Sequence, residues 1–400
     1  MLNIVRTIQD FNAGRDPERL AMKYANMRSS PFVFLRATCH LFYDRLPGGR
    51  LFERAPLTWN CGDLHLENFG SYKGDNRLVY FDVNDFDEAA LAPATWELVR
   101  LLTSMLIGAK SLKVTRPQAM GLCKSFLDAY ATALTDGKAR WAERETADGM
   151  VLELLKSVQN RQRAEFLDSL TERLGKKRSI RLDGRKALPA SDKQRKKISG
   201  FMQEFANTQP NPRFYKTIDI ARRIAGNGSL GVDRYMILVE GKGSPDGNYL
   251  LDLKESLPSA LAPHLKAKQP HWATEAHRIV AIQRRVQATP MAFLQPVSIG
   301  RVPYVLRGLQ PSENRVALDR WNKQLDRLEG VLRTMGEVVA WGQLRSSGRD
   351  GSAIADELID FGERQKWKSE LLETAEHCAG LVGKDWSTYV TAFDEGAFKG

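Results

Sequence analysis

Three short runs of β-type residues, separated by glycine-rich turns, lie in the middle of a chain whose flanking segments have helical patterns. Strand-forming residues in successive short runs, with turn residues between them, are typical of an antiparallel meander. One amphipathic helical segment and two further strand-like runs follow. The runs, the helix and the last two strands are expected at 217–225, 232–240, 248–254, 272–287, 292–300 and 302–309. We therefore predict a compact β-rich unit with one helix.

Helical patterns dominate on both sides of this unit, so we expect an α+β protein with two lobes. A chain of 400 residues is also longer than one average hydrophobic core requires. Residues 17–46 read as helical with a break, where Ser30 can cap a second helix that starts at Pro31. The predicted parts are a catalytic-loop half with a basic helical connection, the β-rich lobe, and C-terminal helices that complete the helical lobe: 1–210, 211–310 and 311–400.

The net charge of +11 is concentrated in one segment. Residues 156–197 hold 14 Lys and Arg against 5 Asp and Glu, in a stretch that reads as helical apart from a basic loop near 175–192. A solvated helical face with a basic loop explains this pattern. The alternative is a patch for an anionic partner such as a substrate, a membrane surface or RNA. RNA-binding signatures with interleaved aromatic residues do not accompany the segment.

Four well-separated cysteines without a CxxC pair argue against a zinc site and against a disulfide scaffold. The sequence has no apolar run of the length that a transmembrane helix needs, and its first residues lack the apolar core of a signal peptide. We therefore expect a cytoplasmic protein.

The stretch "WNCGDLHLENFG" (59–70) carries the first group of chemistry-bearing residues. Asp63 and Asn68 have the spacing D-x-x-x-x-N, and a hydrophobic strand then leads to an acidic cluster that contains Asp82 and Asp85. Carboxylate and amide oxygens at the ends of neighbouring strands suit Mg²⁺, and phosphoryl transfer needs such a cation and a carboxylate to orient the hydroxyl. The alternative is a turn-rich hairpin whose side chains cap backbone groups. His65 is a candidate for bracing the loop or touching a phosphate.

The stretch "GNGSLG" (226–231) is the second group, a G-x-G-x-x-G pattern. A dinucleotide-binding fold would need a helix after it, but a strand-like run follows, so a glycine loop between two antiparallel strands that covers phosphates is the better interpretation. The residues concerned are Gly226, Asn227, Gly228, Ser229 and Gly231. An ordinary hairpin turn is the alternative.

Lys254, in "NYLLDLKES", is the expected lysine on the following strand. A strand lysine that reaches solvent is the alternative. Glu275, at the start of the next helical segment, is the candidate carboxylate partner, with Glu255 and Asp252 as competitors.

These motifs resemble the catalytic core of aminoglycoside phosphotransferases and choline kinases, and more closely a bacterial family catalogued as domain of unknown function 2252. The pieces that carry the resemblance are "MKYANMRSSPFVFLRA", "GDLHLENFG", "FDVNDFDEA", "ARRIAGNGSLG" and "LDLKES". The catalytic half precedes the glycine-rich half, so the resemblance implies a circularly permuted protein kinase-like fold, with a hinge near residues 307–311. Cys61 stands where the kinase pattern has a histidine.

The resemblance also implies roles for individual residues. Asp63 would orient the attacking hydroxyl, and Asn68 would hold a metal together with Asp82 or Asp85, of which the first has the better spacing and the second the better local match. The glycine loop would cover the phosphates, and Lys254 would contact the α- and β-phosphates.

The sequence thus predicts an ATP- and Mg²⁺-dependent phosphotransferase that acts on a hydroxyl. Nucleotidyl transfer uses the same parts with the nucleotide reversed, and a non-catalytic nucleotide-binding regulator or a basic nucleic-acid-binding protein are further alternatives. An NAD-type oxidoreductase fails if 232–240 forms a strand. The acceptor stays open among small alcohols, aminoglycoside-like sugars, lipid headgroups and proteins.

Overall fold

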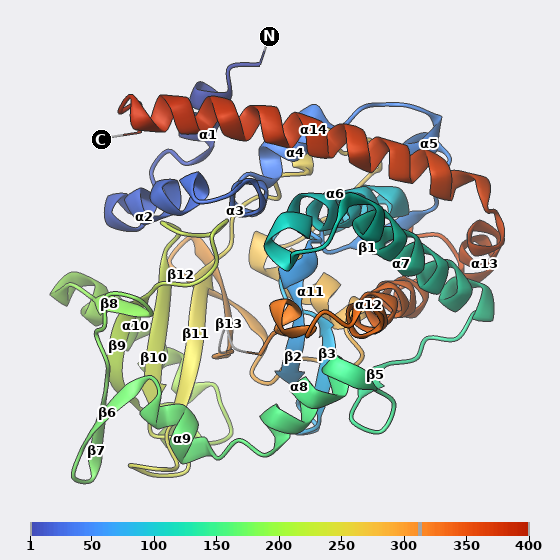
Figure 1. Ribbon diagram of the computed structural model, residues 1–400. Helices are drawn as coiled ribbons and strands as arrows, with labels where there is room; N and C mark the ends of the chain where they lie inside the picture. Colours follow the sequence, from blue (N-terminus) through green and yellow to red (C-terminus); the bar gives the residue numbers. More distant parts are fainter. Residues whose placement is uncertain (1, 311–313, 399–400) are drawn as a thin grey trace.

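A six-stranded antiparallel sheet forms one part of the protein, which we describe from a computed structural model for residues 2–310 and 314–398. The strand order is β12-β13-β11-β10-β9-β8 (Figure 1). The strands are β8 (Ala187–Pro189), β9 (Thr217–Arg223), β10 (Arg234–Val239), β11 (Tyr249–Glu255), β12 (Gln295–Ile299) and β13 (Val302–Gly308). The expected meander is β9-β10-β11, and the two later strand-like runs are β12 and β13, so the predicted β-rich unit is confirmed as an antiparallel sheet.

The two faces of this sheet bury different side chains, because successive strand residues point to opposite sides. One face packs Ile237, Leu251 and Leu253 against the helix α10 (Asp192–Asn207). The other face packs Met236 and Leu250 against the short helix α9 (Arg163–Asp168) and the hairpin of β6 (Thr171–Leu174) and β7 (Lys177–Ile180). Both covers come from the basic segment that precedes the meander.

The secondary structure of this basic segment differs from the expectation of helices with one basic loop. It contains the β6–β7 hairpin, and β8 pairs with β9 at the edge of the sheet. The strands β6 and β7 are short and charged, so they lack the apolar alternation of a typical strand. Their charges are satisfied by contacts that are distant in sequence, as where Arg178 binds Asp168 and Asp246. The sheet therefore begins upstream of residue 211. The expected boundary at residue 311 lies outside the described residues.

Helices from both ends of the chain build the second part, which shares one large hydrophobic core. The long helix α14 (Lys366–Asp394) crosses this part and packs on α6 (Ala94–Leu112), as Figure 1 shows. The other helices are α1 (Ile4–Phe11), α2 (Pro17–Arg28), α3 (Pro31–Ala37), α4 (Cys39–Arg45), α5 (Arg50–Glu53), α7 (Arg116–Asp136), α8 (Gly149–Gln159), α12 (Leu325–Arg345) and α13 (Ala355–Glu363). The expected break before Pro31 is confirmed, because the Ser30 side chain accepts a hydrogen bond from the Val33 amide.

Two small sheets lie within the helical part. β1 (Leu57–Asn60) pairs with β4 (Ala90–Pro93), and β2 (Phe69–Lys73) pairs with β3 (Val79–Val83), which also pairs with β5 (Ala142–Glu143). The helix α11 (Glu275–Val286) follows β11 and packs against β13. The structure is therefore of the α+β class with antiparallel sheets, as expected. The four cysteines are buried free thiols, and among the described helices none combines the length and the apolar character needed to cross a membrane.

Gly336 shows how closely two helices of this core approach. It lies in α12, and a Cβ at this position would come within 2.5 Å of the Phe126 carbonyl oxygen in α7. We expect Gly336→Ala to lower the free energy of unfolding by about 1–3 kcal/mol, because backbone cannot move aside as a flexible side chain can.

Gly330 in the same helix is the matched control, since a Cβ there meets no atom within 4 Å. Gly330→Ala should raise the free energy of unfolding by about 0.5–1 kcal/mol through better helix propensity. Thermal and urea unfolding of both variants check this pair. Equal effects of the two substitutions would contradict the close packing of α7 on α12.

Candidate active site

One cleft brings together most of the residues that the sequence singled out. It lies between the glycine-rich loop of the large sheet and the loop that follows β1. The sequence-predicted residues that line it are Asp63, His65, Asn68, Asp85, Gly226, Asn227, Gly228, Ser229 and Lys254. Asp82, Gly231 and Glu275 are not among the lining residues.

The path of the loop after β1 is fixed by a glycine and by a hydrogen bond from its backbone. Gly62 has φ +83°, and a Cβ there would come within 2.2 Å of the Glu88 carbonyl oxygen, so only glycine fits. The Cys61 amide donates to a carboxylate oxygen of Glu97 at 3.0 Å. Cys61 itself is buried beneath the loop.

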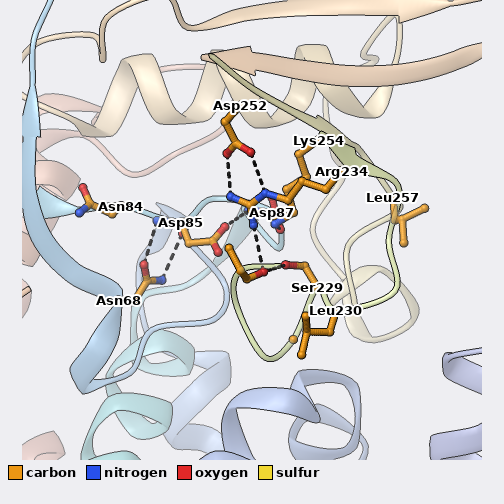
Figure 2. A network of polar contacts seen from close by, with 12 residues as sticks. Asn68, Asn84, Asp85, Asp87, Ser229, Leu230, Arg234, Asp252, Lys254 and Leu257 are labelled. Atoms are coloured by element: carbon orange, nitrogen blue, oxygen red, sulfur yellow. Dashed lines mark hydrogen bonds and ion pairs between the residues drawn. The ribbon is translucent and has the colours of Figure 1, made fainter. Parts of the chain in front are cut away.

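Asn68 ties this loop to the segment that follows β3. Its amide nitrogen donates to the backbone oxygens of Asp63 at 3.0 Å and Asp85 at 3.2 Å, and its Oδ1 accepts from the Asp85 amide at 2.8 Å. Figure 2 shows this pair of contacts between Asn68 and Asp85. The side chain thereby fixes the positions of both aspartates.

Asp63 points into the cleft and is paired with a fully buried arginine. Arg100, in α6, donates from Nε to a carboxylate oxygen of Asp63 at 2.7 Å and also binds the Leu35 carbonyl oxygen. Burial raises the pKa of Asp63, and the Arg100 guanidinium opposes part of that rise. The arginine thus keeps a carboxylate in place while leaving it as a proton acceptor.

His65 braces the loop. It is buried, and its Nδ1 accepts a hydrogen bond from the Glu67 amide at 3.1 Å. Burial, together with the nearby cations Arg36 and Arg100, lowers the pKa of His65 well below its usual range. The imidazole is therefore neutral, and its contact supports the first of the two roles expected for it.

The two candidate metal-binding aspartates occupy different places. Asp82 is buried away from the cleft, where it accepts from the amides of Val83 and Ala288 and lies 3.8 Å from Arg345. Burial raises the pKa of Asp82 to about 6. Asp85 is the aspartate that lines the cleft.

The charges around Asp85 favour its ionised form. Burial raises its pKa, but Lys254, Arg307 and Arg234 outweigh that effect and lower the pKa below its usual value. Among the described residues, no three His, Cys, Asp or Glu side chains are grouped so that they alone could hold a metal ion. This arrangement is compatible with Mg²⁺, which is often held by one or two carboxylates and by phosphates of the substrate.

The partner of Lys254 differs from the expected Glu275. Lys254, in β11, forms an ion pair with Asp87 (Figure 2). Glu275 is the first residue of α11 and binds Arg278 one turn later in the same helix. Arg278 is anchored on the carbonyl oxygens of Asp87 and Ala89 at the edge of the cleft, so it draws Glu275 away from the lysine.

The glycine-rich loop connects β9 to β10, and the run after it is a strand, which removes the oxidoreductase alternative. Gly226 and Gly231 have φ of +72° and +88°. Two residues near the N-terminal end of the described chain hold the loop: Arg15 donates to the Gly228 carbonyl oxygen at 2.7 Å, and the buried Lys23 donates to the same oxygen at 3.0 Å. The loop is therefore not a free flap.

Several charged residues of the cleft were not predicted from the sequence. Arg36 binds Glu67 at 2.6 Å, and Arg315 binds the same carboxylate at 2.7 Å. Arg15 and Glu88 also line the cleft, and burial raises the pKa of Glu88 to about 7. Arg15 and Arg315 lie outside the sequence motifs, whereas Arg36 and Glu88 lie within quoted motifs whose other residues suggested the chemistry.

The basic segment 156–197 is partly neutralised by neighbouring acids. Arg195 binds Asp219 of β9 at 2.7 Å, and Lys197 lies 3.5 Å from Asp233, the residue before β10. Arg178 binds two aspartates, as described above. Part of the positive charge that the sequence concentrates here therefore serves to attach the segment to the sheet.

Comparison with known proteins identifies one family. A model of the family described as an uncharacterized protein conserved in bacteria (DUF2252) matches residues 15–392. The comparisons found no matching curated protein and no matching solved structure. The match includes every residue of the cleft.

Glu97, which holds the Cys61 amide, generates a prediction about pH. It is buried and also accepts from the Gln343 side chain at 2.8 Å, and burial raises its pKa to about 7. Because the folded state holds this proton more tightly than the unfolded state, the contribution to stability is complete at acidic pH and is lost as the pH rises through 7. As the pH rises from about 5 to 8, the free energy of unfolding of the wild type should therefore fall by up to about 3 kcal/mol relative to that of Glu97→Gln.

Urea unfolding of both proteins across this pH range measures the difference. Glu373→Gln, which changes an exposed glutamate of α14, is the matched control and should follow the wild type at every pH. Parallel stability curves for Glu97→Gln and the wild type would contradict a buried, proton-binding Glu97.

Proposed function

The chain belongs to this bacterial family, and we propose that it is an ATP- and Mg²⁺-dependent phosphotransferase that acts on a hydroxyl group of its acceptor. The observation that carries the proposal is the single cleft that unites the glycine loop, Lys254, the loop with Asp63 and Asn68, and the acidic segment with Asp85. These groups come from distant parts of the chain, and phosphoryl transfer uses all of them together.

The order of the strands supports a circularly permuted kinase-like fold. The glycine loop joins the first two strands of the meander, β9 and β10, and Lys254 lies on the third, β11. The helix α11 follows. In the sheet, β13 then lies between β11 and the edge strand β12. Asp63 precedes the hairpin β2–β3 and Asp85 follows it. This hairpin comes before the large sheet in the chain.

The donor atoms in the cleft fit the two proposed ligands. Asp85 and the Asn68 region offer hard oxygen atoms for Mg²⁺, while Lys254 and the backbone of the glycine loop offer positive charge and amide groups for phosphates. Bound Mg²⁺ would supply charge neutralisation for the phosphates. Asp63, held by Arg100, is placed to orient the acceptor hydroxyl and accept its proton.

Two alternatives predict different behaviour. A non-catalytic nucleotide-binding regulator would bind ATP without consuming it. A nucleic-acid-binding protein would depend on the segment 156–197, whose ion pairs with Asp219 and Asp246 support a structural use of that charge instead.

A thermal melt with and without ATP, each with and without Mg²⁺, tests the nucleotide site. A ligand that binds only the folded state raises its stability by about 2.7 kcal/mol at a hundredfold excess over Kd. We expect a Mg²⁺-dependent rise in melting temperature that is lost in Lys254→Ala. Lys266→Ala, at a lysine whose side chain is 87% exposed, is the control and should keep the full rise.

The same melt separates the two aspartates. Asp85→Asn should reduce the Mg²⁺-dependent part of the rise, because it removes a charged oxygen from the cleft, whereas Asp82→Asn should keep it. The absence of any nucleotide effect on the wild type would remove the main support of the proposal.

Asp63→Asn tests catalysis without removing a partner of Arg100. Asparagine preserves the size of the side chain and one oxygen for the arginine, but it cannot take a proton. We expect the rate of ATP consumption to fall by about a hundredfold or more, while the ATP-dependent rise in melting temperature remains. If Asp63→Asn consumed ATP as fast as the wild type, the role assigned to Asp63 would be contradicted and another residue would have to act as the base.

A further inference from the structure

Arg36 is a buried cation on the wall of the cleft, and protein groups satisfy it only in part. Its side chain is 10% exposed, and Nη1 lies 2.6 Å from the Glu67 carboxylate. Its Nε is buried and has no hydrogen-bond partner among residues 2–310 and 314–398. Burial lowers the pKa of Arg36, and Glu67 opposes that effect. Removing a guanidinium from water without a full set of partners is unfavourable, and an anionic ligand would offset that cost.

The fold places Arg36 between the two sides of the cleft. Arg36 lies in the last turn of α3, and a Cβ at Gly228 would come within 3.1 Å of its carbonyl oxygen, so its backbone adjoins the glycine loop. The preceding residue, Leu35, accepts a hydrogen bond from Arg100, the arginine that binds Asp63. The side chain of Arg36 reaches the loop after β1. It therefore lies where the phosphoryl group and the acceptor hydroxyl would meet in the proposed reaction.

Arg315 approaches the same place from a distant part of the chain. Its Nη1 donates at 2.7 Å to Oε2 of Glu67, the oxygen that Arg36 also approaches. The preceding residue, Asn314, is anchored on β2, because its carbonyl oxygen accepts from the Ser71 amide at 2.7 Å. The side chain of Arg315 is 38% exposed. Since a guanidinium group has five N–H donors, most of those on Arg315 are left for a ligand.

The charges in this part of the cleft do not balance among the described residues. The ion pairs join three arginines to two carboxylates, namely Arg36, Arg100 and Arg315 with Asp63 and Glu67. Asp85 has a weaker effect on Arg36 than Asp63 has, and cations of the large sheet already lie around it. The remaining carboxylates of the cleft act on another cation, Arg15; they are Asp87, Glu88 and Glu255. Positive charge therefore exceeds negative charge around Glu67.

From this geometry we propose that Arg36 and Arg315 form an oxyanion subsite beside Asp63, whose ligand is a phosphate group or a similar dianion. The inference rests on the proposed phosphotransferase function and adds a ligand class to its cleft. Glu67 holds the two guanidinium groups together in the empty cleft. Planar guanidinium groups bind the several oxygens of a phosphate more completely than a single carboxylate oxygen shared between them.

The oxyanion can come from two sources. One is the phosphoryl group under transfer, whose negative charge the two arginines would stabilise as it moves from the nucleotide to the acceptor. The other is an anionic group that the acceptor carries beside its reacting hydroxyl. In the second case the subsite would disfavour a cationic acceptor, such as a choline-like alcohol or an amine-bearing sugar, because like charges would meet there.

Calorimetric titration with sulfate, at fixed ionic strength and without nucleotide, tests the subsite. Arg36→Gln should weaken sulfate binding by about tenfold, because it removes a charged hydrogen-bond donor. Glu67→Gln should instead tighten sulfate binding by about threefold or more, because both arginines lose the carboxylate that competes for them. Arg116→Gln breaks an exposed arginine–glutamate pair outside the cleft, so it is the matched control and should leave sulfate binding unchanged.

The opposite effects of the two substitutions separate a ligand site from a structural ion pair. If the three side chains only held the fold together, Glu67→Gln would leave sulfate binding unchanged or weaken it, and that result would overturn the subsite. Sulfate that does not bind the wild type, or that binds Arg36→Gln equally well, would overturn it too. The Glu67 side chain is 38% exposed, so Glu67→Gln decides the question even if Arg36→Gln does not fold.

The same titration with saturating Mg²⁺ and ADP, or Mg²⁺ and a non-hydrolysable ATP analogue, identifies the source of the oxyanion. A subsite for the transferred phosphoryl group binds sulfate beside ADP and loses it to the analogue, whereas a subsite for the acceptor binds sulfate beside both. Displacement of the Arg36-dependent sulfate by ADP would overturn the placement beside Asp63. A protein that binds sulfate as expected but no nucleotide would keep the subsite and refute the proposed phosphotransferase.

Discussion

The Asn68 side chain is the contact on which the geometry of the cleft depends. It is the point where the loop after β1 meets the segment after β3, and one amide group satisfies three backbone groups there. Because unpaired buried backbone groups are costly, the amide fixes both segments with little freedom. Two of the acidic residues of the cleft, Asp63 and Asp85, take their positions from this contact.

Buried charge is the recurring feature of the surrounding structure. Asp63 is paired with Arg100, Lys254 with Asp87, and Asp252 with three arginines. Replacing such pairs by apolar side chains often leaves a protein equally stable, so their presence is weak support for a purely structural role. What they provide here is a cleft whose charges are already oriented before any ligand arrives, as electrostatic catalysis requires.

The sequence predicted those parts of the site that are written in short local patterns. The glycine loop and the D-x-x-x-x-N loop combine unusual residues at fixed spacing, and Lys254 lies on the strand that follows. The strand-like run after the glycines favoured a loop between antiparallel strands over a dinucleotide-binding loop. Asp87 as the partner of Lys254 could not be predicted, because the choice between it and Glu275 depends on where Arg278 anchors the start of α11. The β6–β7 hairpin was missed for a similar reason: its charged residues find partners far away in the sequence.

The grip of Arg15 and Lys23 on the glycine loop has a consequence for how the chain folds. These contacts join residues that are more than 200 positions apart in the sequence; Arg15 and Gly228, for example, are separated by 213 positions. Contacts of such long range form late, because a large loop of chain must be closed first. During synthesis the loop with Asp63 leaves the ribosome well before the sheet that completes its cleft. The charged residues of this loop therefore cannot pair with those of the sheet until the second half of the chain has been synthesised. The protein becomes compact only after that step.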